Sequence, residues 1–101
     1  MGGIVYGISL CLHEQINIVD GKVQEANFND YRVLRLSETP TIHIRVIGSP
    51  SEAPGGIGEA GVPPVGAAIA NAFAASNGGL RLRHSPFVPD RVKMALKARE
   101  T

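Results

Sequence analysis

The stretch PPVGAAIANAFAASNGG, residues 63 to 79, decides the fold, because it predicts a helix with few large side chains. Its two prolines can occupy the first turn of a helix, where a missing N–H costs no hydrogen bond. The Asn-Gly-Gly sequence at 77–79 supplies a C-terminal stop. Ile69 and Phe73 lie one turn apart as large apolar anchors, and the alanines around them let a neighbouring backbone approach closely. We therefore expect the rest of the chain to pack around this helix.

The N-terminal part of the chain predicts a helix followed by a β-hairpin. Residues 2–15 carry apolar side chains at helical spacing. This stripe consists of Ile4, Ile8 and Leu12. No Ser, Thr, Asp or Asn stands before it as an N-cap, so the chain looks as though it begins within a larger structure. Residues 16–28 form two short alternating segments around Asp20-Gly21, a pair that suits a type I′ turn.

Alternating segments in the remaining chain predict two more strands. Residues 41–47, TIHIRVI, alternate apolar and polar side chains as a half-buried strand does, and residues 80–87 alternate in the same way. Residues 89–101 predict a terminal helix, and we interpret residues 29–40 as an irregular linker that crosses the sheet. The order of elements is then α-β-β-β-α-β-α. It predicts one α+β domain over residues 1–101, a two-layer α/β sandwich with a mixed sheet.

Length and charge limit the functions open to this chain. Its 101 residues can bury one modest core, but they leave little room for a cofactor cavity of roughly 300 to 1,000 Å³. Ten basic and nine acidic residues balance, which leaves no electrostatic footprint for nucleic acid or for an anionic membrane. No apolar run approaches the roughly 20 residues of a membrane span. No Lys or Arg precedes the first apolar residues, so we predict no signal peptide, and the location is cytoplasmic by default.

The residues that commonly bind metals are too scattered to predict a metal site. The single cysteine, Cys11, excludes an internal disulfide and a CxxC motif, and it lies in an apolar stretch as a small hydrophobe would. His13, His43 and His84 fall on three different predicted elements, and their spacing matches no zinc pattern. We therefore expect no metal ligand among the side chains of this chain.

The loop PGGIGEAGVPP, residues 54–64, has the spacing G-x-G-x-x-G of a dinucleotide-binding loop. Its context argues against that function. SPSEAPG separates the predicted strand from the first of the three glycines, and two prolines remove backbone N–H groups where a phosphate would need them. No acidic residue follows about 20 residues later to bind a ribose. The dinucleotide interpretation is therefore disfavoured.

The same loop places one carboxylate, Glu59, between the small residues Gly58 and Ala60. A large flat group could approach the backbone on either side of this carboxylate. The loop also leads into the N-terminus of the predicted helix, whose partial positive charge favours a negative group nearby. The plainer alternative is a solvated glutamate on a glycine-rich loop, and the residue pattern alone favours that alternative.

Three segments together resemble one enzyme family. GGIGEAGVPPVGAAIANAFAA resembles the loop and helix near the C-terminus of the large, molybdenum-binding subunit of the xanthine dehydrogenase and aldehyde oxidase family. NFNDYRVLRLSETPTIHIRVI and GGIVYGISLCLHEQINIVDGKV resemble the stretches before it in the isoquinoline 1-oxidoreductase type of that family. The resemblance runs in order over residues 2 to about 88.

This resemblance implies roles for the residues of the loop. Glu59 matches the glutamate beside the molybdenum, which in the family takes a proton from the Mo–OH group so that the oxygen can attack an N-heterocycle or an aldehyde. Ile57, Gly58 and Gly61 match positions where the family's backbone passes close to the cofactor. The sequence departs from the family at Ala60, where a proline is common, and this change leaves the carboxylate in place.

The resemblance also implies partners and a cofactor. The family's cofactor is molybdopterin cytosine dinucleotide, and its electrons leave through the iron–sulfur clusters of a separate 2Fe-2S small subunit. Most groups that hold the cofactor lie upstream of the matching segments, and some relatives are exported to the periplasm. We therefore expect a C-terminal piece of such a subunit, from a truncated reading frame or a separately made domain, that alone binds no cofactor and is inactive.

A second hypothesis assigns the chain a different class of function. If the apolar stripe of the first predicted helix were exposed, contiguous apolar surface would promote association. The chain would then be a non-catalytic, homo-oligomeric or partner-binding module. Neither hypothesis includes nucleic acid or a membrane span.

Overall fold

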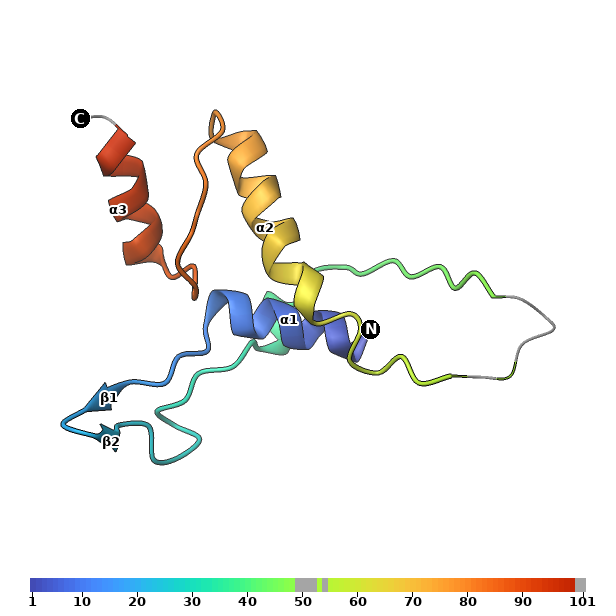
Figure 1. Ribbon diagram of the computed structural model, residues 1–101, viewed down its shortest axis with the longest axis horizontal. Coiled ribbons are helices and arrows are strands. Elements are labelled where there is room, and N and C mark those ends of the chain that lie inside the picture. Colours follow the sequence, from blue (N-terminus) through green and yellow to red (C-terminus); the bar gives the residue numbers. More distant parts are fainter. Residues whose placement is uncertain (49–52, 54, 100–101) are drawn as a thin grey trace.

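The computed structural model describes residues 1–48, 53 and 55–99. It contains three α-helices, a short 3-10 helix and one two-stranded antiparallel sheet, so the α+β class is confirmed (Figure 1). The elements are α1 Gly2–Leu12, β1 Ile18–Val19, β2 Lys22–Val23, η1 Leu36–Glu38, α2 Pro63–Ser76 and α3 Pro89–Arg99.

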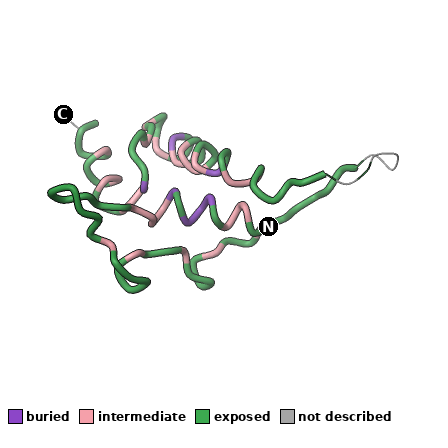
Figure 2. Tube along the Cα trace, turned by 60° about the horizontal axis from the view of Figure 1, so that its bottom comes forward, coloured by how far each residue is buried: buried purple, intermediate pink, exposed green. Residues whose placement is uncertain are grey.

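The centre of the structure is the crossing of α1 and α2, and most of the buried residues lie on these two helices (Figure 2). A Cβ atom built on Gly7 of α1 would lie 2.7 Å from Cβ of Val65 and 2.8 Å from the carbonyl oxygen of Val62. The start of α2 therefore packs directly on the backbone of Gly7, where glycine leaves no side chain between them. The close approach comes from this glycine of α1, whereas the sequence had pointed to the alanines of α2. The apolar residues buried in the described chain are Ile8, Cys11, Val65 and Ala74.

The predicted hairpin is confirmed. Ile18 pairs with Val23 and Val19 with Lys22. Asp20 and Gly21 have φ angles of 49° and 74°, the left-handed conformations that a type I′ turn requires. All four strand residues are exposed, so the turn rather than burial specifies this hairpin.

The terminal helix is also confirmed, and its charges suit its direction. Asp90 lies in the first turn of α3, and Lys97 and Arg99 lie in the last. These positions place negative charge near the positive end of the helix dipole and positive charge near the negative end. The backbone N–H of Phe87, just before α3, donates to the carbonyl of Cys11 over 2.7 Å and ties the C-terminal part to the end of α1.

The predicted strands at 41–47 and 80–87 are not formed, so the predicted order of elements and the sandwich are not confirmed. In the described part of the chain both segments lack strand pairing, and the hairpin is the sheet that forms. Alternation predicted half-buried strands, but Val46 and Ile47 are 88% and 89% exposed. Alternation indicates which side chains would be buried in a sheet, but no described residue packs over Val46 and Ile47 to bury them.

The molecule is open for its size. Its accessible surface is 8207 Å², whereas a compact monomer of this mass exposes about 5,500 Å². The radius of gyration is 17.0 Å, against about 13 Å for a compact domain of this length. In the connection between η1 and α2, residues 41–48 and 55–57 extend away from the helices (Figure 1). Many large apolar side chains of the described residues therefore remain exposed, among them Phe28, Leu36, Val46, Ile47 and Ile57.

Among the helices of the described residues, none has the length and apolar character needed to cross a bilayer.

We predict that Gly7→Ala lowers the free energy of unfolding by about 1–3 kcal/mol, because the added methyl group has to displace the α2 backbone. The matched control is Gly66→Ala in the interior of α2, where an added Cβ would meet only the sulfur of Cys11, at 3.8 Å. There alanine should stabilise the helix by about 0.5–1 kcal/mol. Urea unfolding followed by circular dichroism measures both changes. Equal effects of the two variants would contradict the close crossing.

Candidate functional site

Glu59 begins a turn that leads directly into α2. The backbone N–H of Val62 donates to the carbonyl of Glu59 over 2.9 Å, and α2 starts one residue later at Pro63. The Glu59 side chain is exposed, and it has no hydrogen bond or ion pair with residues 1–48, 53 or 55–99. The carboxylate is therefore available to a group from outside the described chain.

Two glycines, Gly3 in α1 and Gly61 in the turn, allow the turn to lie directly against α1. A Cβ atom on Gly3 would lie 3.0 Å from the carbonyl oxygen of Gly58, and one on Gly61 would lie 3.4 Å from Cγ1 of Ile4. The turn therefore rests directly on the first turn of α1. Because the start of α1 and the Glu59 turn are far apart in sequence, local patterns could not have predicted this contact.

The residues predicted to lie near the cofactor divide into two groups. Ile57 is 81% exposed, and a Cβ atom on Gly58 would meet nothing within 4 Å, so both face open space beside Glu59. Gly61 instead faces α1. The backbone of Gly58 has no neighbour on this side, and the Glu59 carboxylate beside it is exposed. A large flat group could therefore approach on the side of Ile57 and Gly58.

The start of α2 offers few backbone donors to an anion. Val62 is the N-cap residue, no side chain caps the helix, and prolines occupy its first positions. Each proline lacks an N–H group, so a phosphate would find fewer donors here than at an ordinary helix N-terminus. This geometry agrees with the sequence argument against a dinucleotide-binding loop.

The described residues contain no group of three or more His, Cys, Asp or Glu side chains that could hold a metal ion. Cys11 is buried, and burial raises the pKa of its thiol. His13 lies 3.6 Å from Glu38, and His84 lies far from both in the chain.

A polar network that the sequence analysis did not identify fixes the linker to α1. Ser9 Oγ accepts the backbone N–H of Leu34 over 2.9 Å, and the Tyr31 hydroxyl donates to Glu14 Oε2 over 2.7 Å. The hydrogen bond to Glu14 raises the pKa of Tyr31. A cavity of about 440 Å³ lies between α1 and this linker, next to Tyr31.

Two carboxylates organise the linker itself. Asp30 accepts the backbone N–H groups of Ala26 and Asn27 over 3.0 and 2.9 Å, and these hydrogen bonds lower the pKa of Asp30. Glu38 accepts the backbone N–H of Arg35 over 3.0 Å, which lowers the pKa of Glu38. Each acidic residue stands three or four residues after the N–H groups that it accepts. This spacing was the signal in the sequence that could have predicted both turns.

Positively charged side chains also stabilise the ionised carboxylate of Glu38. Arg32 Nη2 lies 2.5 Å from Glu38 Oε1, and the charges of Arg32 and His13 lower the pKa of Glu38 further. Since His13 directly follows α1, this contact joins the linker to the end of that helix. The network therefore positions the linker that precedes the long connection to Glu59.

Comparison with known proteins gives the context of this turn. No family model matches the chain. It is 40% identical over 93 residues to the beta subunit of isoquinoline 1-oxidoreductase from Brevundimonas diminuta, a match that covers 92% of this chain and 12% of that protein. It is 40% identical over 96 residues to the membrane-bound aldehyde dehydrogenase (pyrroloquinoline-quinone) of Gluconacetobacter polyoxogenes, covering 95% and 12%.

A third relative is a subunit of the nicotinate dehydrogenase of Pseudomonas putida, 33% identical over 95 residues that cover 94% of this chain and 8% of the relative. The chain therefore spans 12% or less of the length of these relatives. Nearly the whole chain is thus similar to a short stretch of oxidoreductase subunits.

The family can be stated more closely. Over nearly all of its length the chain matches members of the molybdopterin-binding xanthine dehydrogenase and aldehyde oxidase family, and one of these relatives is an isoquinoline 1-oxidoreductase. The resemblance found in the three sequence segments is thereby confirmed. Two of the relatives are named as subunits, so partner subunits are a property of such enzymes.

We predict that acid loosens the linker. The pKa values of Asp30 and Glu38 are lowered by folding, so the stability they confer is present above the ordinary carboxyl range near pH 4 and is lost as the pH falls through their lowered folded-state values. Urea unfolding at a series of pH values should show stability falling below about pH 4. The fall should be smaller in the Glu38→Gln variant, and an unchanged pH profile in that variant would contradict this role.

Proposed function

We propose that this chain supplies the active-site base, Glu59, to a molybdenum hydroxylase that oxidises N-heterocycles or aldehydes with water-derived oxygen. One observation carries the proposal. The glutamate that the resemblance identifies as the base is exposed and has no partner among the described residues, on a turn that glycines hold against α1. A general base has to be fixed in position and also free to reach the proton it accepts.

The residues of the turn fit the approach of the cofactor. The open backbone at Gly58 and the exposed Ile57 leave room beside the carboxylate, and Ala60 adds only a methyl group. When bound, molybdopterin cytosine dinucleotide would supply the oxygen to be transferred and take up the electron pair. Glu59 would take up a proton at its carboxylate oxygen, and Gly61 would keep the turn on α1 while it does so.

We propose that the chain is inactive alone and acts as one domain of a larger subunit. Glu59 is exposed to solvent in this structure, whereas a general base works in a site that the substrate and cofactor enclose. The missing enclosure and the groups that hold the cofactor would come from the remainder of the large subunit. A 2Fe-2S small subunit would then receive the electrons.

The remainder of the large subunit would also complete the fold. The extended segments 41–47 and 80–87 have the alternation of strands but no pairing in the described chain. Strands supplied from outside would pair with them and give the two-layer sandwich. This addition would cover Val46 and Ile47, which are now exposed.

A second candidate function is a homo-oligomeric or partner-binding module without catalysis. The apolar stripe first suggested for it is mostly covered, since Ile8 is 7% exposed and packs at the α1–α2 crossing. The observation that favours it is the exposure of three apolar side chains of one segment, Ile44, Val46 and Ile47. Sedimentation of the isolated chain tests it, because a concentration-independent monomer excludes self-association through these side chains.

We predict that Glu59 is required for activity in a completed large subunit. The matched segment of the isoquinoline 1-oxidoreductase of Brevundimonas diminuta is replaced by this chain, and isoquinoline oxidation and molybdenum content are measured. Glu59→Gln should lower the rate by about 10²–10⁴-fold while the molybdenum content stays the same. The control Asp20→Asn removes another carboxylate but keeps the hairpin turn, and it should leave the rate unchanged.

Activity that survives Glu59→Gln in the molybdenum-loaded hybrid would refute the proposed base. The isolated chain gives a separate check, because it should contain no molybdenum when produced in a host that makes the cofactor. Near-stoichiometric molybdenum in the isolated chain would show that the residues present suffice for a site.

A further inference from the structure

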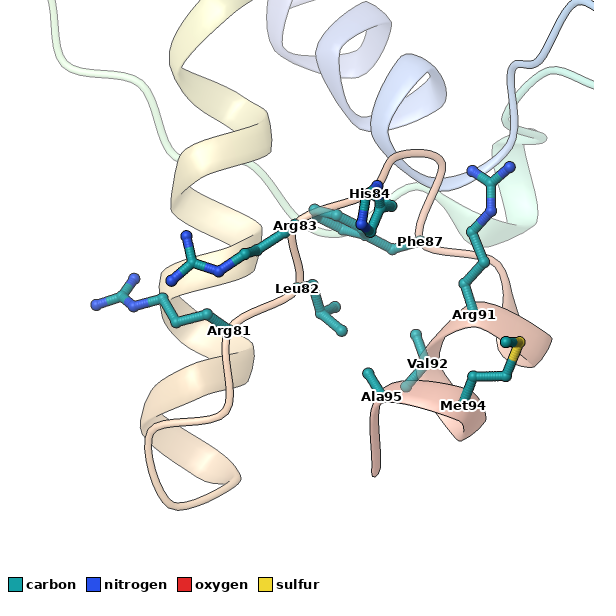
Figure 3. Close-up of a pocket in the computed structure, with 9 residues that line it drawn as sticks. All are labelled: Arg81, Leu82, Arg83, His84, Phe87, Arg91, Val92, Met94 and Ala95. Atoms are coloured by element: carbon teal, nitrogen blue, oxygen red, sulfur yellow. The ribbon is translucent and has the colours of Figure 1, made fainter. Parts of the chain in front are cut away.

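A groove of about 570 Å³ lies between the extended segment 80–87 and α3 (Figure 3), and Glu59 is not among its lining residues. Its floor is apolar: Leu82 points toward α3, where Val92 and Ala95 face it, and Phe87 closes one end. These four residues are half-buried in the present structure. An apolar floor in an open groove indicates a place where apolar side chains of a partner would be covered.

The segment beside this groove carries positive charge that no carboxylate of the described residues balances. Arg81 donates to the amide oxygen of Asn71, and Arg91 donates to backbone carbonyls and to Oε1 of Gln15. All of these partners are neutral.

The other two basic residues of the groove are less engaged still. Within the described residues, Arg83 and His84 have no hydrogen bond or ion pair. The groove therefore presents apolar surface next to uncompensated positive charge, a combination that favours a partner both apolar and acidic.

The backbone beside the groove is an unpaired strand edge. The N–H of Leu80 is bonded to Asn77 and the N–H of Phe87 to Cys11, so both ends of the segment are held. Between them, the backbone groups of residues 81–84 have no hydrogen-bond partner in the described chain. Arg81 and Arg83 point to the side of α2 and Leu82 to the side of α3, as alternate residues of a strand do (Figure 3).

We propose that residues 81–84 bind an extended segment of the polypeptide that completes the large subunit, added as a strand along this edge. Its acidic side chains would lie beside Arg81 and Arg83, and its apolar side chains would lie beside Leu82 and enter the groove. The inference rests on the proposed function, because that function makes the chain a small part of a longer polypeptide. The chain spans 12% or less of its relatives, so most of the length of such a protein lies outside it.

The charges argue against the alternative occupants within this chain. A second copy of segment 81–84 would place arginines opposite arginines. The other unpaired segment, 41–47, carries His43 and Arg45 on its polar face, so it too is basic. Since like charges directly opposite one another destabilise a strand pair, an acidic segment from elsewhere is the matching occupant.

Short peptides test this proposal on the full chain. One capped peptide alternates valine and glutamate, and its matched control alternates valine and lysine. The glutamate peptide should bind at least about tenfold more tightly, because it pairs with both arginines and the lysine peptide is repelled by them. Hydrogen exchange should slow at the amides of 81–84 when the glutamate peptide is bound.

Charge reversal at the edge should reverse this preference. The double variant Arg81→Glu and Arg83→Glu should favour the lysine peptide, a gain that unfolding could not produce. The control double variant, Lys93→Glu and Lys97→Glu, makes the same change of charge on α3 outside the groove and should keep the original preference. Equal binding of both peptides, unprotected amides at 81–84, or identical behaviour of the two double variants would overturn the proposal.

This result is separable from the test of Glu59. If the glutamate peptide is preferred but the activity of the hybrid does not depend on Glu59, the proposed strand addition at 81–84 stands and the proposed role of Glu59 as base is refuted. Loss of activity in Glu59→Gln without any peptide preference would support the base and refute the groove.

Discussion

The close packing of Val65 and the Val62 carbonyl against the backbone of Gly7 is the constraint on which the rest of the structure depends. It joins the two helices that carry every buried apolar residue of the core. From α1, the linker is held by side chains near the C-terminal end of the helix, and the Glu59 turn is held by glycines at the N-terminal end. One helix therefore positions both the carboxylate and the segment that leads toward it, while α2 fixes where the turn ends.

Elements specified by local sequence could be predicted, and elements that need distant partners could not. Two prolines and Asn-Gly-Gly bounded α2, and Asp20-Gly21 fixed the hairpin, because each signal acts on its own neighbours. Segment 41–47 shows the opposite case, since alternation records a preference for burial without saying what supplies it. Glu59 was singled out through resemblance, whereas the contact of its turn with Gly3 became visible only in the structure.

The two unpaired segments share a feature that bears on assembly. Both have apolar residues on one face and basic residues on the other, with Arg45 in the first and Arg81 and Arg83 in the second. Pairing them with each other would bring like charges together, which agrees with the absence of a sheet between them in the described chain. In the proposed function, acidic strands from the rest of a large subunit would pair with both segments and balance their positive charge. The exposed surface of the chain thus agrees with the proposed function, in which the rest of a large subunit covers it.

The distance in sequence between Gly7 and Val65 also has a consequence for biosynthesis. During translation α1 emerges long before α2, and it has no partner in the other helix until the whole intervening chain has been made. The hairpin can close early, because its contacts are local, but the helix crossing has to close a long loop and so forms later. The contact of the Glu59 turn with Gly3 closes a loop of similar length, so it too forms later than the hairpin.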